Sequence, residues 1–228
     1  MTHQAKDAQA SMQADASLSA ALRVQHSFTR QHFRAAEFFA ESAAALERDI
    51  LAADGDDEIG KSRHRAFVSG AVVSAVMGLE SCINEIYLDA RDKSTKLAEL
   101  DESEMDLLAL WWPEIESRPI LLKYQHALLL LDRPCFSKGD NPYQDADHLI
   151  HLRNALTHYK PEWDDSLDRH ANVESRLTGR FELNPLSTKN AQWFPDQCLG
   201  SGCAKWAVST SEGLVSVFCA KLGIAKRA

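Results

Sequence analysis

The sequence predicts an all-α protein, an antiparallel helical bundle with a long N-terminal helical hairpin and a C-terminal extension. Two stretches, residues 18–51 and 61–91, have the hydrophobic spacing of long helices. Between them lies Asp54-Gly55-Asp56-Asp57, a sequence that favours a turn over a helix. No stretch shows the sustained alternation of a β-strand. Two long helices joined by a short turn form a helical hairpin, and this hairpin sets the fold class.

Each helix of the hairpin has its own pattern. In residues 18–51, large apolar residues recur at mixed spacings of three and four: Leu22, Phe33, Phe38, Phe39, Leu46 and Ile50. The middle of the second helix, residues 69–79, is apolar nearly all round and rich in Gly, Ala and Ser. A helix of that kind is central, and its neighbours pack closely against it.

Shorter helices follow. We expect helices at residues 102–112, ended by Pro113, at 121–131, at 145–160, ended by Pro161, and at 204–222 despite Gly213. Residues 135–142 and 190–202 are predicted loops, and residues 164–187 are charged and irregular. The expected organisation is a flexible N-terminal segment (1–17), a helical bundle (18–163) and an irregular extension ending in a helix packed on the bundle (164–228).

Composition narrows the functional classes. The 228 residues, 45% of them apolar, suit one domain, and no run of 18 uninterrupted apolar residues suggests a membrane span. The N-terminus lacks a secretory pattern, and five scattered cysteines favour reduced thiols, so we expect a cytoplasmic protein without a membrane partner. A net charge of −8 excludes a general nucleic-acid coat. An acidic protein can still cleave RNA if a few cationic side chains converge in one groove.

The predicted helix at 145–160 carries the residues that suggest chemistry. On a helix Leu149, Leu152, Leu156 and Tyr159 line one face, which is the natural core face. Asn154 and His158 lie together on the opposite side, with His151 beside them. Arg153 lies roughly 140° around the axis from His158, so one straight helix cannot aim both at one phosphate.

Two arrangements would resolve this mismatch. The helix end could unwind before Pro161, because the residue before a proline avoids the α region. Alternatively, a two-fold axis could bring the arginine of one copy toward the histidine of the other, which would duplicate the site. We favour the second arrangement.

The residue types suit phosphoryl chemistry on RNA. His158 would act as general acid–base on a ribose 2′-hydroxyl and the leaving 5′-oxygen, since histidine exchanges protons near neutral pH. Arg153 would stabilise the charge that develops on the phosphoryl group. Asn154 would hydrogen-bond a phosphate oxygen or hold His158 in one tautomer, and Lys160 adds a second substrate-binding cation. This chemistry needs no metal or cofactor. The bare Arg–His spacing is common, however, and a surface arginine with a capping histidine would show it too.

The segment Leu152-Arg153-Asn154-Ala155-Leu156-Thr157-His158 resembles the signature of the HEPN superfamily. The resemblance covers roughly residues 18–163 and includes residues 79–87 and Pro142-Tyr143-Gln144. It implies a helical bundle and a metal-independent endoribonuclease of a bacterial toxin or defence system. It also implies a homodimer with facing motifs, 2′,3′-cyclic phosphate products, catalytic roles for Arg153 and His158, and a possible antitoxin or regulatory partner.

One departure from the family pattern concerns regulation. HEPN toxins silenced by nucleotide transfer carry a tyrosine two residues after the histidine, where this chain has Lys160 and places Tyr159 one residue early. The resemblance therefore does not extend to that form of silencing. A non-catalytic HEPN-like dimerisation or interaction module is the alternative function.

Other candidate residues have structural alternatives of equal or greater weight. Glu80, four residues before Asn84 on an apolar helix, could orient Arg153 or reach a bound ribose, or both residues could occupy an exposed stripe. Cys198 and Cys203 lack the second pair that a zinc site needs. The basic segment 61–65 is more typical of a solvated helix start. Three tryptophans could stack on bases or anchor the core: Trp111, Trp112 and Trp163.

Overall fold

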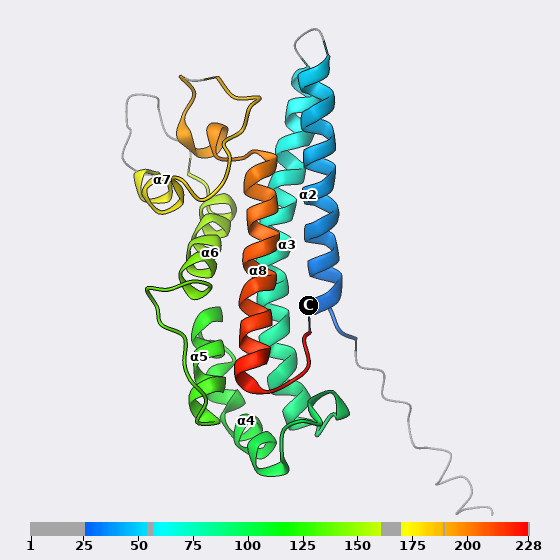
Figure 1. The fold of residues 1–228 in the computed structure, drawn as a ribbon, viewed down its shortest axis with the longest axis vertical. Helices are drawn as coiled ribbons and strands as arrows, with labels where there is room; N and C mark the ends of the chain where they lie inside the picture. Colours follow the sequence, from blue (N-terminus) through cyan, green and yellow to red (C-terminus); the bar gives the residue numbers. More distant parts are fainter. Residues whose placement is uncertain (1–25, 54–56, 161–169, 189, 228) are drawn as a thin grey trace, which may run out of the picture.

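The computed structural model describes residues 26–53, 57–160, 170–188 and 190–227, and the regular elements in these ranges are all helical (Figure 1). The predicted all-α class is therefore confirmed. The predicted flexible segment 1–17 lies outside the described residues. The helices are α2 (Thr29–Ala52), α3 (Glu58–Arg91), α4 (Glu102–Ile115), α5 (Ile120–Leu130), α6 (Tyr143–Thr157), α7 (Ala171–Leu177) and α8 (Ser201–Leu222).

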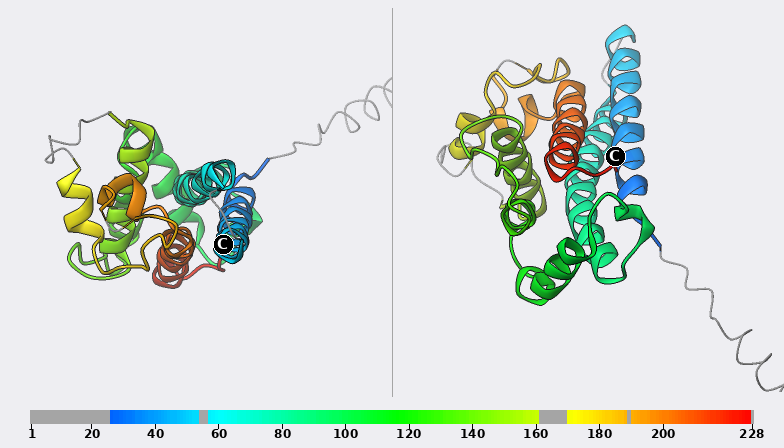
Figure 2. Two further views of the ribbon diagram at one scale, coloured as in Figure 1. Left: turned by 90° about the horizontal axis from the view of Figure 1, so that it is seen from above. Right: turned by 60° about the horizontal axis from the view of Figure 1, so that its bottom comes forward.

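Three long helices form the body of the bundle. The antiparallel hairpin of α2 and α3 is present as predicted, and α8 packs along both, running in the same direction as α3 (Figure 1). The shorter helices α4, α5 and α6 pack against the other side of α3, and α6 also contacts α8. Viewed from above, α3 and α8 lie between α2 and α6 (Figure 2). One cluster of buried residues runs from Phe33 to Ile224, so the C-terminal residues share the core of the hairpin.

Small residues allow α2 and α3 to approach closely, as the composition of the second helix predicts. A Cβ on Gly78 would lie 2.7 Å from the ring of Phe33, and one on Gly70 would lie 2.9 Å from the ring of Phe39. The buried face of α2 is made mostly of alanines rather than the large residues of the predicted stripe: Ala36, Ala40, Ala43 and Ala44. Phe38, which the sequence pattern placed on the buried face, is 60% exposed. A contact this close accommodates methyl groups and excludes a further ring.

A polar network attaches the start of α8 to the hairpin. The Glu47 carboxylate accepts hydrogen bonds from the Ser201 backbone N–H (2.8 Å) and hydroxyl (2.7 Å), and it lies 2.9 Å from Nε2 of His64. Burial raises the pKa of Glu47, but its hydrogen bonds with His64 and Ser201 outweigh this effect and lower the pKa. The basic segment 61–65 is largely engaged in the same region, because Arg65 pairs with Asp196 and Lys61 pairs with Glu58.

Two predicted boundaries require correction. Pro113 does not end its helix, which continues to Ile115. A proline in the last turn removes only one backbone donor, and the helix ends two residues later. The helix predicted to reach Pro161 ends instead at Thr157, because Tyr159 leaves the helical path and stacks on His170. The region predicted to be irregular contains the short helix α7, and the predicted loop 190–202 contains a kinked turn at Trp193–Gln197.

Helix α3 is long and apolar enough to cross a membrane, by length and composition alone. In the bundle, 56% of its most apolar window is buried by the rest of the protein. The central helix of a helical bundle has the same properties, because it must be apolar on most sides.

The close contact between α2 and α3 can be tested with a pair of glycine substitutions. We expect Gly78→Ala to lower the free energy of unfolding by about 1–3 kcal/mol, because the new methyl group displaces the Phe33 ring. Gly213→Ala, where a Cβ meets no atom within 4 Å, should raise it by about 0.5–1 kcal/mol through helix propensity. Urea unfolding followed by circular dichroism measures both. Equal stabilisation by the two substitutions would contradict the close approach.

Candidate functional site

Helix α6 is held against α3 and α8 by the apolar face that the sequence predicts. Leu149 and Leu152 are fully buried, and Leu156 is half-buried against the core. Tyr159 is an exception, because it lies beyond the end of the helix and is 42% exposed. The predicted core face therefore holds for the helix proper and is wrong at Tyr159.

The end of α6 turns away from the helix axis at His158. The His158 backbone N–H donates to the Asn154 carbonyl at 2.9 Å, which completes the last turn. The Tyr159 ring then stacks on His170, with ring centroids 5.3 Å apart and planes within 4°. Both rings contact the buried Phe194. Because Tyr159 packs in this aromatic cluster, the chain leaves the helical path before Pro161, and the helix ends at Thr157.

A pocket of about 320 Å³ lies beside this helix end. The end of α6 and Lys160 form one wall, and His170 with the first turn of α7 forms the other. Its lining residues are His151, Asn154, Ala155, His158, Lys160, His170, Asn172 and Val173. Three of the four predicted site residues, Asn154, His158 and Lys160, thus share one pocket, and all three are exposed.

Arg153, the fourth predicted site residue, is not among the residues that line the pocket. Its side chain is half-buried, and its Nε is buried without a hydrogen-bond partner among the described residues. Within one chain the structure therefore does not bring Arg153 and His158 to a common cavity. Their separation agrees with the rotation of a helix, and the catalytic roles of both residues remain predictions.

Two histidines on α6 lie in an environment that disfavours their charged form. Burial lowers the pKa of His151, and the nearby Arg176 guanidinium lowers it further. Burial, Arg180 and Arg176 likewise lower the pKa of His148, whose Nδ1 has no hydrogen-bond partner in the described part of the chain. Burial and Arg176 therefore both favour the neutral form of the His151 imidazole.

The contribution of α7 and of His170 before it to the pocket was not predicted from the sequence. His170 and Asn172 line the pocket, and Arg176 sets the charge around it, pairing with Asp147 at 3.2 Å. These residues lie in a stretch that shows only charge and irregularity in the sequence. No spacing rule connects them to α6, since the connection depends on the tertiary fold.

The other candidates have structural partners. Asn84 accepts a hydrogen bond from the buried Lys123 at 2.9 Å. Among the described residues, Arg153 forms neither a hydrogen bond nor an ion pair with Glu80. Trp112 is buried and stacks on Tyr87 at 5.3 Å, whereas Trp111 is 45% exposed. Trp163 lies outside the described residues.

The described residues contain no group of three or more His, Cys, Asp or Glu side chains arranged to hold a metal ion. Cys198 and Cys203 are buried free thiols. Comparison of the chain with protein-family models, with curated proteins and with solved structures found no match.

The charge environment of the pocket yields a direct prediction. We expect Arg176→Gln to raise the pKa of His151, because the substitution removes a nearby cation that disfavours the imidazolium. Histidine resonances followed by NMR across a pH titration measure this change. Arg118→Gln, an exposed change in the turn between α4 and α5, serves as the control. An unchanged His151 titration in the Arg176 variant would show that Arg176 does not contribute to the pKa of His151.

Proposed function

We propose that this protein is a metal-independent endoribonuclease of a bacterial toxin or defence system, of HEPN type and cytoplasmic. In this proposal it acts as a homodimer with its site at the two-fold interface. The observation that carries the proposal is the pocket at the end of α6, where exposed Asn154, His158 and Lys160 gather. These residues supply a general acid–base, a cation and an amide within one cavity.

The proposed reaction is an internal transfer at phosphorus. His158 removes the proton from a ribose 2′-hydroxyl, and the 2′-oxygen attacks the adjacent phosphorus. The bond from phosphorus to the 5′-oxygen breaks, and the leaving oxygen takes up a proton from the imidazolium. The products are a 2′,3′-cyclic phosphate and a free 5′-hydroxyl. Arg153 stabilises the charge on the phosphoryl oxygens, and Asn154 and Lys160 bind the phosphate.

The position of Arg153 supports the dimeric form of the proposal. Arg153 does not line the His158 pocket, and its buried Nε has no hydrogen-bond partner among the described residues. A buried guanidinium nitrogen without a partner is costly, and a phosphate or acidic group at an interface would satisfy it. A two-fold contact through the end of α6 would bring each Arg153 toward the other chain's pocket.

The net charge of −8 is compatible with this activity but not with avid binding of RNA. An enzyme of this charge would depend on the few cations around its pocket and would lose substrate quickly as salt rises. Control by an antitoxin or regulatory protein is part of the proposal. Such a partner would act by covering the site, because Lys160 replaces the tyrosine that nucleotide transfer would modify.

A non-catalytic HEPN-like interaction module is the second candidate. The observation that favours it is the exposure of large apolar side chains: Phe38 is 60% exposed, Leu129 66% and Leu110 73%. Where such side chains form one contiguous patch, they indicate a surface that binds other proteins. In this case the α6 motif would shape a contact surface without cleaving RNA.

Cleavage of RNA by matched variants distinguishes the two functions. We expect the wild-type protein to cleave RNA in the presence of EDTA and His158→Ala to be at least about 100-fold slower, since it lacks the general acid–base. His26→Ala, an exposed histidine before α2, should retain full activity. Detection of 2′,3′-cyclic phosphate ends identifies the reaction. Equal rates for folded wild-type protein and His158→Ala would leave only the interaction module.

A further inference from the structure

A second pocket, of about 510 Å³, lies at the start of α2, away from the α6 motif. In the view from above, α2 lies on the opposite side of α3 and α8 from α6, and the two helices share no contact (Figure 2). Five cations line this pocket: Arg30, Arg34, Lys96, Lys226 and Arg227. In a chain with a net charge of −8, such a local concentration of positive charge requires an explanation.

Ion pairs with a buried carboxylate hold the segments that line the pocket together. Asp89 on α3 is fully buried and pairs with Arg227 at 2.5 Å, and Lys96 approaches it at 3.5 Å. Arg227 also donates to the Lys96 carbonyl at 3.0 Å. These contacts hold the C-terminal tail across the end of the hairpin, where Figure 1 shows it returning toward the start of α2. The tail thereby carries Lys226 into the same pocket as the arginines of α2.

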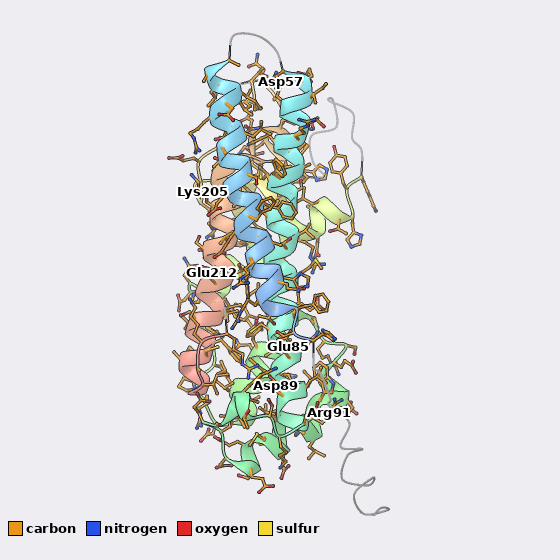
Figure 3. The ribbon with its side chains drawn as sticks, turned by 90° about the vertical axis from the view of Figure 1, so that its right-hand side faces the viewer. Asp57, Glu85, Asp89, Arg91, Lys205 and Glu212 are labelled. Atoms are coloured by element: carbon orange, nitrogen blue, oxygen red, sulfur yellow. The ribbon has the colours of Figure 1, made fainter. Side chains whose placement is uncertain are left out.

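A second carboxylate, Glu85, lies in the pocket wall and is engaged by the backbone. It accepts hydrogen bonds from the Ser27 hydroxyl (2.8 Å) and from the Phe28 (2.8 Å) and Thr29 (3.0 Å) N–H groups. Figure 3 shows Glu85 and Asp89 on α3 just below the start of α2. The two carboxylates thus hold together α2, α3 and the tail.

Two cations of the pocket, Arg30 and Arg34, have no carboxylate partner among the described residues, whereas Lys226 interacts electrostatically with Glu212. Arg30 and Arg34 are exposed and lie four residues apart on one face of α2, where like charges repel and weaken a helix. Among the described residues that line the pocket, five cations face one carboxylate, Glu85, and this leaves a positive surplus that a bound anion would neutralise.

A buried hydroxyl provides independent evidence for a ligand. Thr29 lines the pocket and is 2% exposed, and its Oγ1 has no hydrogen-bond partner among the described residues. Unsatisfied buried polar atoms are uncommon in native proteins, and each indicates strain or a missing partner. An anion seated between Arg30 and Lys226 could accept this hydrogen bond.

We propose that this pocket binds a small molecule through a diphosphate group. Arginine pairs favour phosphate because their fork geometry matches two oxygens at once. The pocket volume of about 510 Å³ lies in the range of small-molecule sites, about 300–1,000 Å³. Among the described residues that line it, Ala225 is the one apolar residue, so charge rather than stacking provides recognition. The acidic character of the rest of the chain disfavours a long strand of RNA as the occupant.

Calorimetric titration of the full-length protein tests the proposal, with inorganic pyrophosphate and ADP as separate probes and adenosine as a control. We expect both diphosphates to bind and adenosine not to bind. Tighter binding of ADP would identify a nucleotide as the source of the group, and equal binding would identify the diphosphate alone. Arg30→Glu combined with Arg34→Glu should weaken binding by about tenfold or more.

Control variants keep the test specific. Arg63→Glu combined with Arg118→Glu makes the same change in charge at exposed positions outside the pocket and should bind like the wild type. His158→Ala should also bind normally, so this result is independent of the proposed ribonuclease activity. Thr29→Val should weaken binding if Oγ1 donates to the anion, and unchanged binding would remove that contact from the proposal.

Three results would overturn the inference. One is an absence of pyrophosphate and ADP binding by folded protein at low salt. A second is binding that the Arg30/Arg34 double variant leaves unchanged. Binding of a 12-residue RNA that depends on these arginines, without binding of either diphosphate, would likewise replace a small ligand with RNA.

Discussion

The close approach of α2 to α3 is the constraint on which the rest of the bundle depends. Gly78 and Gly70 leave room for the rings of Phe33 and Phe39, and the alanines of α2 complete a contact without large side chains. Because one side of α3 is covered so tightly, α8 can pack along both helices, and the opposite side of α3 is free to receive α4, α5 and α6. The position of every candidate site residue follows from this order of packing.

The two pockets depend on that scaffold in different ways. The α6 pocket forms where the helix ends, and its second wall comes from His170 and α7, which are joined to α6 by the Tyr159 stack. The second pocket, lined by Arg30 and Arg34, forms where the hairpin helices meet the C-terminal tail. The buried Asp89 holds the tail there through its ion pair with Arg227. They lie on opposite sides of the bundle, so a ligand in one need not contact a ligand in the other (Figure 2).

Local patterns in the sequence predict most of the helices, because the apolar residues of each helix repeat with its period. The hairpin, the central place of α3 and the burial of Leu149 and Leu152 all follow from such repeats. Phe38 and Tyr159 depart from the pattern for tertiary reasons. Helix α3 lies too close to α2 to accommodate the Phe38 ring, and the Tyr159 ring stacks on His170. The grouping of Asn154 with His158 is a local property of a helix. The contributions of His170, Arg176 and Arg227 depend on long-range contacts that no short motif encodes.

The central claim is that Arg153 and His158 act together only across two chains, and mixed dimers test it most directly. An Arg153→Ala chain and a His158→Ala chain, each inactive alone, are co-expressed in equal amounts. If each site takes its arginine from one chain and its histidine from the other, one of the two sites in every mixed dimer is intact. Random pairing then restores about one quarter of wild-type RNA cleavage. An inactive mixture, from proteins shown to exchange subunits, would contradict the claim.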